Sequence, residues 1–348
     1  MRKVQPEVEE ILRELLSNRR NIGNVSFPDD TQLARMREEI SSLRVGLLVD
    51  DFRTNLKRLR NEPDHALETY FLFLLMYSIL LFSDRRDVTE VEAGRHDIPP
   101  SLVDSYLNSM QNGGSPSRMN ELRKQVYDSA VEKAKELNLD QRIYSINVPT
   151  GSGKTLTSVG FALRLRERIN SELGYTPRII YSLPFITIIE QNYEVLKKVL
   201  LPISGAGGKV PSELLLAHHH LSGVKFSTAN NEYDINESEF LIESWSSEIV
   251  VTTFVQFFYS IISDNRGMSV KFHNIVNSIV ILDEIQSLPY DLWELVRFAI
   301  LFLANAFHTY FIFTTATLPM LLRENEIEEA VDHKELIYKR LHRVELLY

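Results

Sequence analysis

The chain has 348 residues, of which 44% are hydrophobic and 24% are charged, the composition of an ordinary soluble globular protein. This length is enough for about two domains. The net charge of -9 excludes a globally basic nucleic-acid-binding protein, so any nucleic-acid contact must use local donors and helix N-termini. The absence of cysteine excludes disulfides, cysteine-ligated zinc and iron–sulfur clusters, and it fits a reducing compartment.

The N-terminal region, residues 1–111, is predicted to be helical. Apolar side chains recur there at amphipathic spacing, and further helical patterns cover residues 30–48 and 70–82. The run 70–82 is shorter than the roughly 18 apolar residues that cross a bilayer, so we expect a buried core helix. The N-terminus becomes acidic instead of apolar, which argues against a signal peptide. We therefore expect a cytoplasmic protein without membrane contact. The first amphipathic residues are Val8, Ile11, Leu12, Leu15 and Leu16.

A predicted linker separates this helical region from the rest of the chain. The stretch Asn112-Gly113-Gly114-Ser115-Pro116-Ser117 combines two glycines and a proline with small polar residues. We place the linker at residues 112–119, between a helical region at 1–111 and a second domain at 120–348.

The second region alternates helical patterns with short apolar strands, which is typical of an α/β fold with a mainly parallel sheet and helices on both faces. In open sheets of this kind, ligands bind beyond the carboxyl ends of the strands. The polar residues that follow each strand are therefore the first place to look for a site. The predicted strands are Ile143–Asn147, Arg178–Leu183, Leu214–Ala217, Ile249–Thr252, Ile279–Leu282 and Tyr310–Phe313.

A glycine-rich turn between the first of these strands and a helical run predicts a phosphate-binding loop. Gly151 and Gly153 would let backbone N–H groups turn toward phosphate oxygens, and the following helix N-terminus would add partial positive charge. Lys154 would reach the β and γ phosphates of ATP, and Thr155 would hold Mg²⁺. Val148 stands where the strict pattern has glycine, so only the core of the pattern is intact. The cofactor-binding residues are predicted to be Thr150, Gly151, Ser152, Gly153, Lys154 and Thr155.

Two adjacent carboxylates end the apolar strand that lies about 130 residues after the glycine turn. Asp283 would bind Mg²⁺, and Glu284 would orient and deprotonate the attacking water, a division of labour suited to hydrolysis of the γ-phosphate. A strand that ends in Asp-Glu could also be a solvated strand end. Its pairing with the glycine turn favours the catalytic interpretation.

Together these segments resemble superfamily 2 helicases of the DEAD/DEAH-like type. Val148–Thr155 corresponds to motif I, Asp283–Gln286 to motif II, and Thr315–Pro319 looks like motif III. Within that superfamily, the chain looks most like the CRISPR-associated helicase-nuclease of type I interference systems. The resemblance implies a RecA-like domain at residues 120–348. It also implies that the catalytic residues are Lys154, Asp283, Glu284 and Gln286, and that Thr315, Ala316 and Thr317 couple hydrolysis to domain movement.

Two shorter segments resemble motifs that touch the nucleic-acid backbone in such helicases. They are residues 182–191, similar to motif Ia, and residues 252–254, similar to motif Ib. Each has a simpler alternative, because the first could merely end a strand and the second could cap the following helix. The candidate contacts to nucleic acid are Pro184, Phe185, Gln191, Thr252 and Thr253.

The adenine-binding residue is less clearly marked. The family places a glutamine or an arginine upstream of motif I, which makes Arg123 and Gln125 candidates here. The alternative is that both lie on a solvated helix face.

The chain also departs from the helicase-nuclease pattern at both ends. Asp84 matches a metal-binding aspartate of the nuclease, but the histidine and His-Asp ligands expected before it are missing, and one carboxylate cannot hold two metals. We therefore expect no nuclease activity. Too few residues follow Thr317 for a second RecA-like domain, so we expect weak hydrolysis unless a second polypeptide supplies that domain.

The partners that the resemblance implies are single-stranded DNA, a CRISPR surveillance complex and a polypeptide carrying the second RecA-like domain and the nuclease. Two alternatives stay open. One is another phosphate-loop ATPase or kinase, although a kinase would need substrate-binding arginines in lid segments. The other is a catalytically inert interaction module.

Overall fold

The computed structural model describes residues 63–89, 94–111, 117–204, 208–218, 235–262, 265–317, 321–332, 335 and 337–338. Within these ranges the centre of the protein is one seven-stranded sheet in the order β3-β4-β2-β5-β6-β1-β7, and all of its pairings are parallel. This confirms the predicted α/β class, and the fold is RecA-like. The strands are β1 (Ile143–Asn147), β2 (Ile179–Leu183), β3 (Leu215–His218), β4 (Ile249–Thr253), β5 (Ile279–Asp283), β6 (Tyr310–Thr315) and β7 (Glu328–Glu329).

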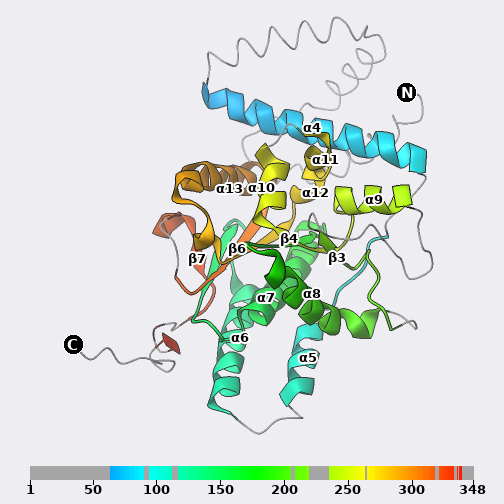
Figure 1. The fold of residues 1–348 in the computed structure, drawn as a ribbon. Helices are drawn as coiled ribbons and strands as arrows, with labels where there is room; N and C mark the ends of the chain where they lie inside the picture. The colour runs from blue at the N-terminus through cyan, green and yellow to red at the C-terminus, as the bar shows by residue number, and fades with distance from the viewer. Residues whose placement is uncertain are drawn as a thin grey trace, which may run out of the picture.

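Helices cover both faces of the sheet (Figure 1). One face packs against α5 (Ser101–Gln111), α6 (Arg118–Glu136), α7 (Lys154–Leu173) and α8 (Ile186–Leu200). The other face packs against α4 (Pro63–Thr89), α9 (Ile235–Ser244), α10 (Phe254–Ile262), α12 (Phe272–Ile275) and α13 (Trp293–Phe307), with α11 (Arg266–Ser269) beside α4 and α10. Short 3-10 turns lie at Leu201–Ile203, Ile285–Ser287, Tyr290–Leu292 and Glu324–Glu326.

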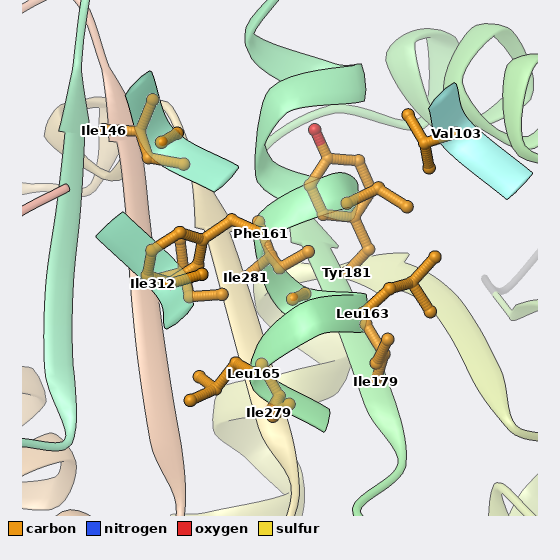
Figure 2. Close-up of a cluster of buried hydrophobic side chains, with 14 of the residues drawn as sticks. Val103, Ile146, Phe161, Leu163, Leu165, Ile179, Tyr181, Ile279, Ile281 and Ile312 are labelled. Carbon is orange, nitrogen blue, oxygen red and sulfur yellow. The ribbon is translucent and has the colours of Figure 1, made fainter. Parts of the chain in front are cut away.

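Alternate residues of the central strands feed two separate cores. In β5, Ile279 and Ile281 pack toward α7, whereas Val280 and Leu282 pack toward α10 and α13. Figure 2 shows the first of these cores, in which Phe161 of α7 faces the apolar side chains of the strands. A strand that is buried on both faces reads as a continuous apolar run, which is why these strands could be recognised in the sequence.

The helix predicted at residues 70–82 is confirmed, and it extends over the whole of α4. Only its inner face is buried: Phe71 is 3% exposed, whereas Met76 is 47% exposed and Leu80 is 51% exposed. The prediction of a buried core helix is therefore met on one side only. None of the described helices is both long and apolar enough to cross a membrane.

All six predicted strands are confirmed to within two residues at each end, but β7 was missed. Its two residues, Glu328 and Glu329, carry side chains that are depleted in strands, so their composition gave no strand signal. The helical patterns predicted before residue 63 and most of the linker at 112–119 lie outside the described residues. The division at 112–119 stays a prediction. In the described part, α4 and α5 pack into the two cores that flank the sheet.

Close packing of α6 on α7 depends on a glycine in α7. A Cβ at Gly160 would lie 2.5 Å from Cε2 of Tyr127, which is closer than real side chains approach. Alanine normally stabilises a helix interior by about 0.5–1 kcal/mol relative to glycine. Here we expect Gly160→Ala to lower the free energy of unfolding by about 1–3 kcal/mol, measured by urea denaturation, because the clash overpacks the interface. In a Tyr127→Ala background the same substitution should be neutral or stabilising. A stabilising effect with Tyr127 present would contradict this account.

A buried lysine, Lys271, lowers the free energy of unfolding by an amount that depends on pH. Lys271 is 1% exposed, and its ammonium lies 5.3 Å from the ring centre of Trp245 and 3.5 Å from Oε1 of Gln256. Burial lowers its pKa from 10.5 to about 8. The unfolded chain therefore binds more protons between pH 8 and 10.5, so this group favours the folded state increasingly as the pH rises through that window.

We expect Lys271→Met to raise the free energy of unfolding at pH 7 by up to about 3 kcal/mol. The difference from the wild type should shrink as the pH rises from 8 toward 10.5. Denaturation at several pH values measures it, with Lys135→Met on the exposed face of α6 as a matched control. A difference that is independent of pH would contradict the assignment.

Candidate functional site

The predicted phosphate-binding loop lies between β1 and α7. Gly151 and Gly153 have φ of 84° and 89°, a left-handed conformation that favours glycine. The hydroxyl of Ser152 donates to the carbonyl of Pro149 at 2.7 Å, which closes the turn from inside. The loop thus delivers Lys154 at the first turn of α7, where backbone N–H groups have no helical partners and can bind an anion.

Arg123 braces this loop from α6. Its Nε donates to the carbonyl of Gly151 at 2.9 Å, and its Cγ lies 3.5 Å from the position that a Cβ on Gly153 would occupy. Gln125 lies on the same helix and its side chain is exposed. A contact of either residue with adenine stays a prediction, but Arg123 already has a structural role in shaping the loop.

Lys154 forms an ion pair with Glu284, which stands directly after β5. The backbone of Glu284 has φ of 55° and ψ of 44°, a left-handed conformation that is rare for a side chain of this kind and costs of the order of 1–3 kcal/mol. This turn projects the carboxylate back toward α7. Since the two side chains are 10% and 30% exposed, the pair is largely sheltered but open to solvent on the glutamate side.

Asp283 is held in the core at the last position of β5. Its Oδ1 accepts a hydrogen bond of 2.6 Å from Thr314, and its Oδ2 accepts one of 3.1 Å from the phenol of Tyr181. Burial raises the pKa of the Asp283 carboxyl, and the negative charge of Glu284 acts in the same direction. The hydrogen bond from Thr314 and the charge of Lys154 oppose this rise. Asp283 is therefore fixed in position, and a nearby cation would stabilise its ionised form.

Thr155 occupies the second position of α7, and its hydroxyl donates to Oδ1 of Asn192 on α8 at 3.0 Å. Burial raises the pKa of the Tyr181 phenol well above its ordinary value, and the charge of Asp283 raises it further, so the phenol stays protonated and donates to Asp283. A threonine hydroxyl and a carboxylate are the hard oxygen donors that Mg²⁺ prefers. No group of three or more acidic or histidine side chains within the described ranges could hold a metal by itself, so phosphate oxygens and water would have to complete the shell.

A second set of contacts leads from Glu284 to the end of β6. The amide of Gln286 donates to the Glu284 carboxylate, and its Oε1 lies 2.7 Å from the hydroxyl of Thr315. The Thr315 hydroxyl also accepts from the backbone N–H of Thr317 at 3.1 Å. The structure thus brings the predicted catalytic residues and the predicted coupling residues into one connected group. Ala316 contributes its backbone, and its carbonyl accepts a hydrogen bond from Tyr338.

The candidate nucleic-acid residues are placed less uniformly. Phe185 is 59% exposed and Gln191 is exposed, whereas Pro184 is half-buried. Thr252 is fully buried, and its hydroxyl donates to the carbonyl of His218 at 2.8 Å. The hydroxyl of Thr253 accepts from the backbone of Gln256 at 3.1 Å, which is the helix-capping alternative. Contact with nucleic acid stays a prediction for all five.

Sequence reasoning missed three residues of the site, namely Tyr181, Asn192 and Thr314. Each lies on an element whose role was assigned to other residues, and each makes its contact across strands or helices far apart in the sequence. A polar residue inside an otherwise apolar strand was the one available signal. It applies to Tyr181 and Thr314, because buried polar groups are nearly always hydrogen-bonded.

Comparison with known proteins places this chain in a family. The model of the DEAD/DEAH box helicase family matches residues 123–324, which is more than half of the chain and includes the loop, both carboxylates and Thr315–Thr317. The chain belongs to the DEAD/DEAH box helicase family. The predicted helicase resemblance is confirmed.

Individual relatives are similar over part of their length. The CRISPR-associated nuclease/helicase Cas3 of Haloferax volcanii is 33% identical over 197 residues, which are 55% of this chain and 21% of the relative. The chain therefore spans about a fifth of the length of that curated relative.

Two solved structures are also similar. Cas3 from T. fusca with ADP has a TM-score of 0.42 at 13% identity, covering 59% of this chain and 22% of that one. The DUF1998 helicase MrfA bound to DNA has a TM-score of 0.42 at 16% identity, covering 70% and 31%. No functional conclusion follows from scores of this size.

Two glycines at the ends of α7 allow a matched test of the loop. Gly153 precedes the helix and Gly174 follows it, with φ of 89° and 80°, so alanine is strained by about 1–2 kcal/mol at either position. We expect Gly153→Ala to weaken binding of a fluorescent ATP analogue by at least about tenfold, since alanine strains the left-handed backbone at this position and so shifts the N–H groups of the loop that would bind phosphate. Gly174→Ala, which opens into free space, should lose stability but keep affinity. Equal affinities of the two variants would contradict the loop assignment.

Proposed function

We propose that this chain is the ATP-binding first half of a superfamily 2 helicase that acts on single-stranded DNA in CRISPR antiviral defence. The observation that carries the proposal is the convergence of the ends of β1, β5 and β6. Lys154, Glu284, Gln286 and Thr315 form one line of contacts there, which joins a phosphate-binding loop to a carboxylate and to a coupling motif.

The side chains divide the work of ATP hydrolysis between them. The backbone of residues 150–155 would bind the phosphates, and Lys154 would exchange its contact with Glu284 for one with the β and γ phosphates. The released Glu284 carboxylate would then accept a proton from the attacking water as a general base. Gln286 would keep its hydrogen bond to Glu284, so that a movement of the released Glu284 side chain also moves Gln286 relative to Thr315.

The residues fit a bound Mg²⁺. Thr155 and Asp283 would hold it, directly or through water, and Tyr181 and Thr314 fix the position of the Asp283 carboxylate. When bound, Mg²⁺ neutralises charge that develops on the phosphate oxygens. The hydrogen bonds to Asp283 leave part of its lone-pair capacity available for this purpose.

The helicase activity is proposed to need a second RecA-like domain, carried by another polypeptide or by further chain. An arginine from such a domain typically contributes about 10³ to 10⁵ in rate to nucleotide hydrolysis. The proposed partners are single-stranded DNA and a CRISPR surveillance complex. The similarity to the relative named as a CRISPR-associated nuclease/helicase supports nucleic acid as a partner and a CRISPR-associated role. No nuclease activity is proposed for this chain.

The test is steady-state ATP hydrolysis and ATP binding by the purified chain with Mg²⁺, with and without single-stranded DNA. Lys154→Ala should weaken ATP binding by at least about tenfold, because a charge-assisted hydrogen bond contributes about 1.5–3 kcal/mol. Glu284→Gln should keep binding and abolish turnover, since the amide cannot accept the proton. Lys135→Ala, an exposed lysine of α6, is the matched control.

The outcomes separate the alternatives. ATP binding that depends on Lys154, together with slow turnover, supports the proposal that this chain is the ATP-binding half of a helicase and needs a second RecA-like domain. Rapid DNA-stimulated turnover by the chain alone would overturn the requirement for a second domain. Absence of ATP binding in the wild-type chain would overturn the proposed function and favour an inert interaction module.

A further inference from the structure

The segment that follows β7 returns to the phosphate site. The phenol oxygen of Tyr338 lies 2.9 Å from Oδ1 of Asn147, the last residue of β1, and it also donates to the carbonyl of Ala316. Tyr338 is 191 residues from Asn147 and 22 from Ala316 in the sequence. One side chain thus contacts the strand that enters the phosphate loop and the turn that follows β6.

The edge strand β7 holds this segment next to β1. The carboxylate of Glu329 accepts hydrogen bonds from the backbone of Asn147 at 3.2 Å and from the hydroxyl of Ser145 at 3.2 Å. The N–H of Ala330 donates to the carbonyl of Ser145 at 2.7 Å. These contacts fix residues 329 and 330 against β1. The Tyr338 phenol extends the contacts of this segment from β1 to Ala316.

The contacts of Tyr338 close a ring around the site. From Lys154 the ring runs through Glu284 and Gln286 to Thr315, one residue before Ala316. Through the Tyr338 phenol it then returns to Asn147, which precedes the loop that carries Lys154. If Lys154 exchanges Glu284 for another partner, the change can affect Tyr338 by two routes. One is the series of side-chain contacts that ends at Thr315, and the other is the backbone of the loop that begins at Asn147.

The phenol is suited to this role as a donor. Burial raises the pKa of Tyr338, and the charges of Glu329 and Glu284 raise it further. The hydroxyl therefore stays protonated at neutral pH, where it can donate to only one acceptor at a time. Two competing acceptors, one on each arm of the ring, give the side chain two alternative hydrogen bonds.

We infer that Tyr338 is a positioning residue that couples nucleotide binding to the segment after β7, by donating its phenol hydrogen either to Asn147 or to Ala316. This inference rests on the proposed function, because it requires that ATP bind at Lys154. Its consequence is that ATP changes the state of residues 328–338, which lie far from the phosphate loop in the sequence. The Tyr338 hydroxyl is the group that transmits this change.

The test is hydrogen–deuterium exchange of the full chain, with and without Mg²⁺ and a non-hydrolysable ATP analogue. In the wild type, the analogue should change exchange in peptides covering the loop at 150–157 and the segment at 328–338. Tyr338→Phe should keep nucleotide affinity within about twofold and keep the change at the loop, because the phenol lies outside the phosphate cradle. The change at 328–338 should be lost.

Two further variants separate coupling from simple support. Asn147→Ala removes one acceptor and should also uncouple the segment. Tyr175→Phe removes a buried phenol that has no hydrogen-bond partner in the described chain and lies between α7 and the amino end of β2, and it should behave as the wild type. The readout is the nucleotide-dependent difference, which a merely structural role of Tyr338 would leave in place.

Each outcome decides the matter. Loss of the response at 328–338 in Tyr338→Phe, with binding retained, supports the inference. A full response in that variant, or none in the wild type despite protection of the loop, overturns the inference but not the proposed function. If the analogue protects no loop residue in the wild type, the proposed function fails and this inference fails with it.

Discussion

The ion pair between Lys154 and Glu284 is the interaction on which the arrangement of the site depends. The two residues are 130 positions apart in the sequence, and β1 and β5 are not neighbours in the sheet, because β6 lies between them. The side chains must therefore meet over the end of β6. Glu284 manages this by adopting a left-handed backbone conformation directly after its strand, and the sheet on either side supports that strain.

The position of β6 supports the proposed coupling role of the residues at its end. Since this strand separates the loop from the carboxylates, anything that moves Lys154 relative to Glu284 also acts on the residues between them. Thr314 binds Asp283, and Thr315 lies within hydrogen-bonding distance of Gln286. Two successive threonines thus connect β6 to Asp283 directly and to Glu284 through Gln286. Because a rigid parallel sheet fixes the strand ends, small changes of partner are not absorbed by the scaffold.

The sequence was sufficient to predict the six long strands, the glycine loop and the Asp-Glu pair, because each depends on residues close together in the chain. It could not give the contacts of Tyr181 and Asn192, since these require the order of strands in the sheet and the docking of α8. It also missed β7, whose two glutamates read as surface, and with it the return of Tyr338 to the site. At Thr252, a motif-like residue is buried with its hydroxyl already bonded, so similarity to a motif alone did not describe its surroundings.

Membership of the DEAD/DEAH box helicase family and the geometry around Lys154 both lead to the claim that this ammonium exchanges a carboxylate for phosphate. The most direct measurement is a crystal structure of the chain with Mg²⁺ and a non-hydrolysable ATP analogue. The account predicts that Nζ of Lys154 leaves Glu284 and contacts the β and γ phosphates, with the metal near Thr155 and Asp283. An analogue bound elsewhere, with the pair between Lys154 and Glu284 intact, would contradict it.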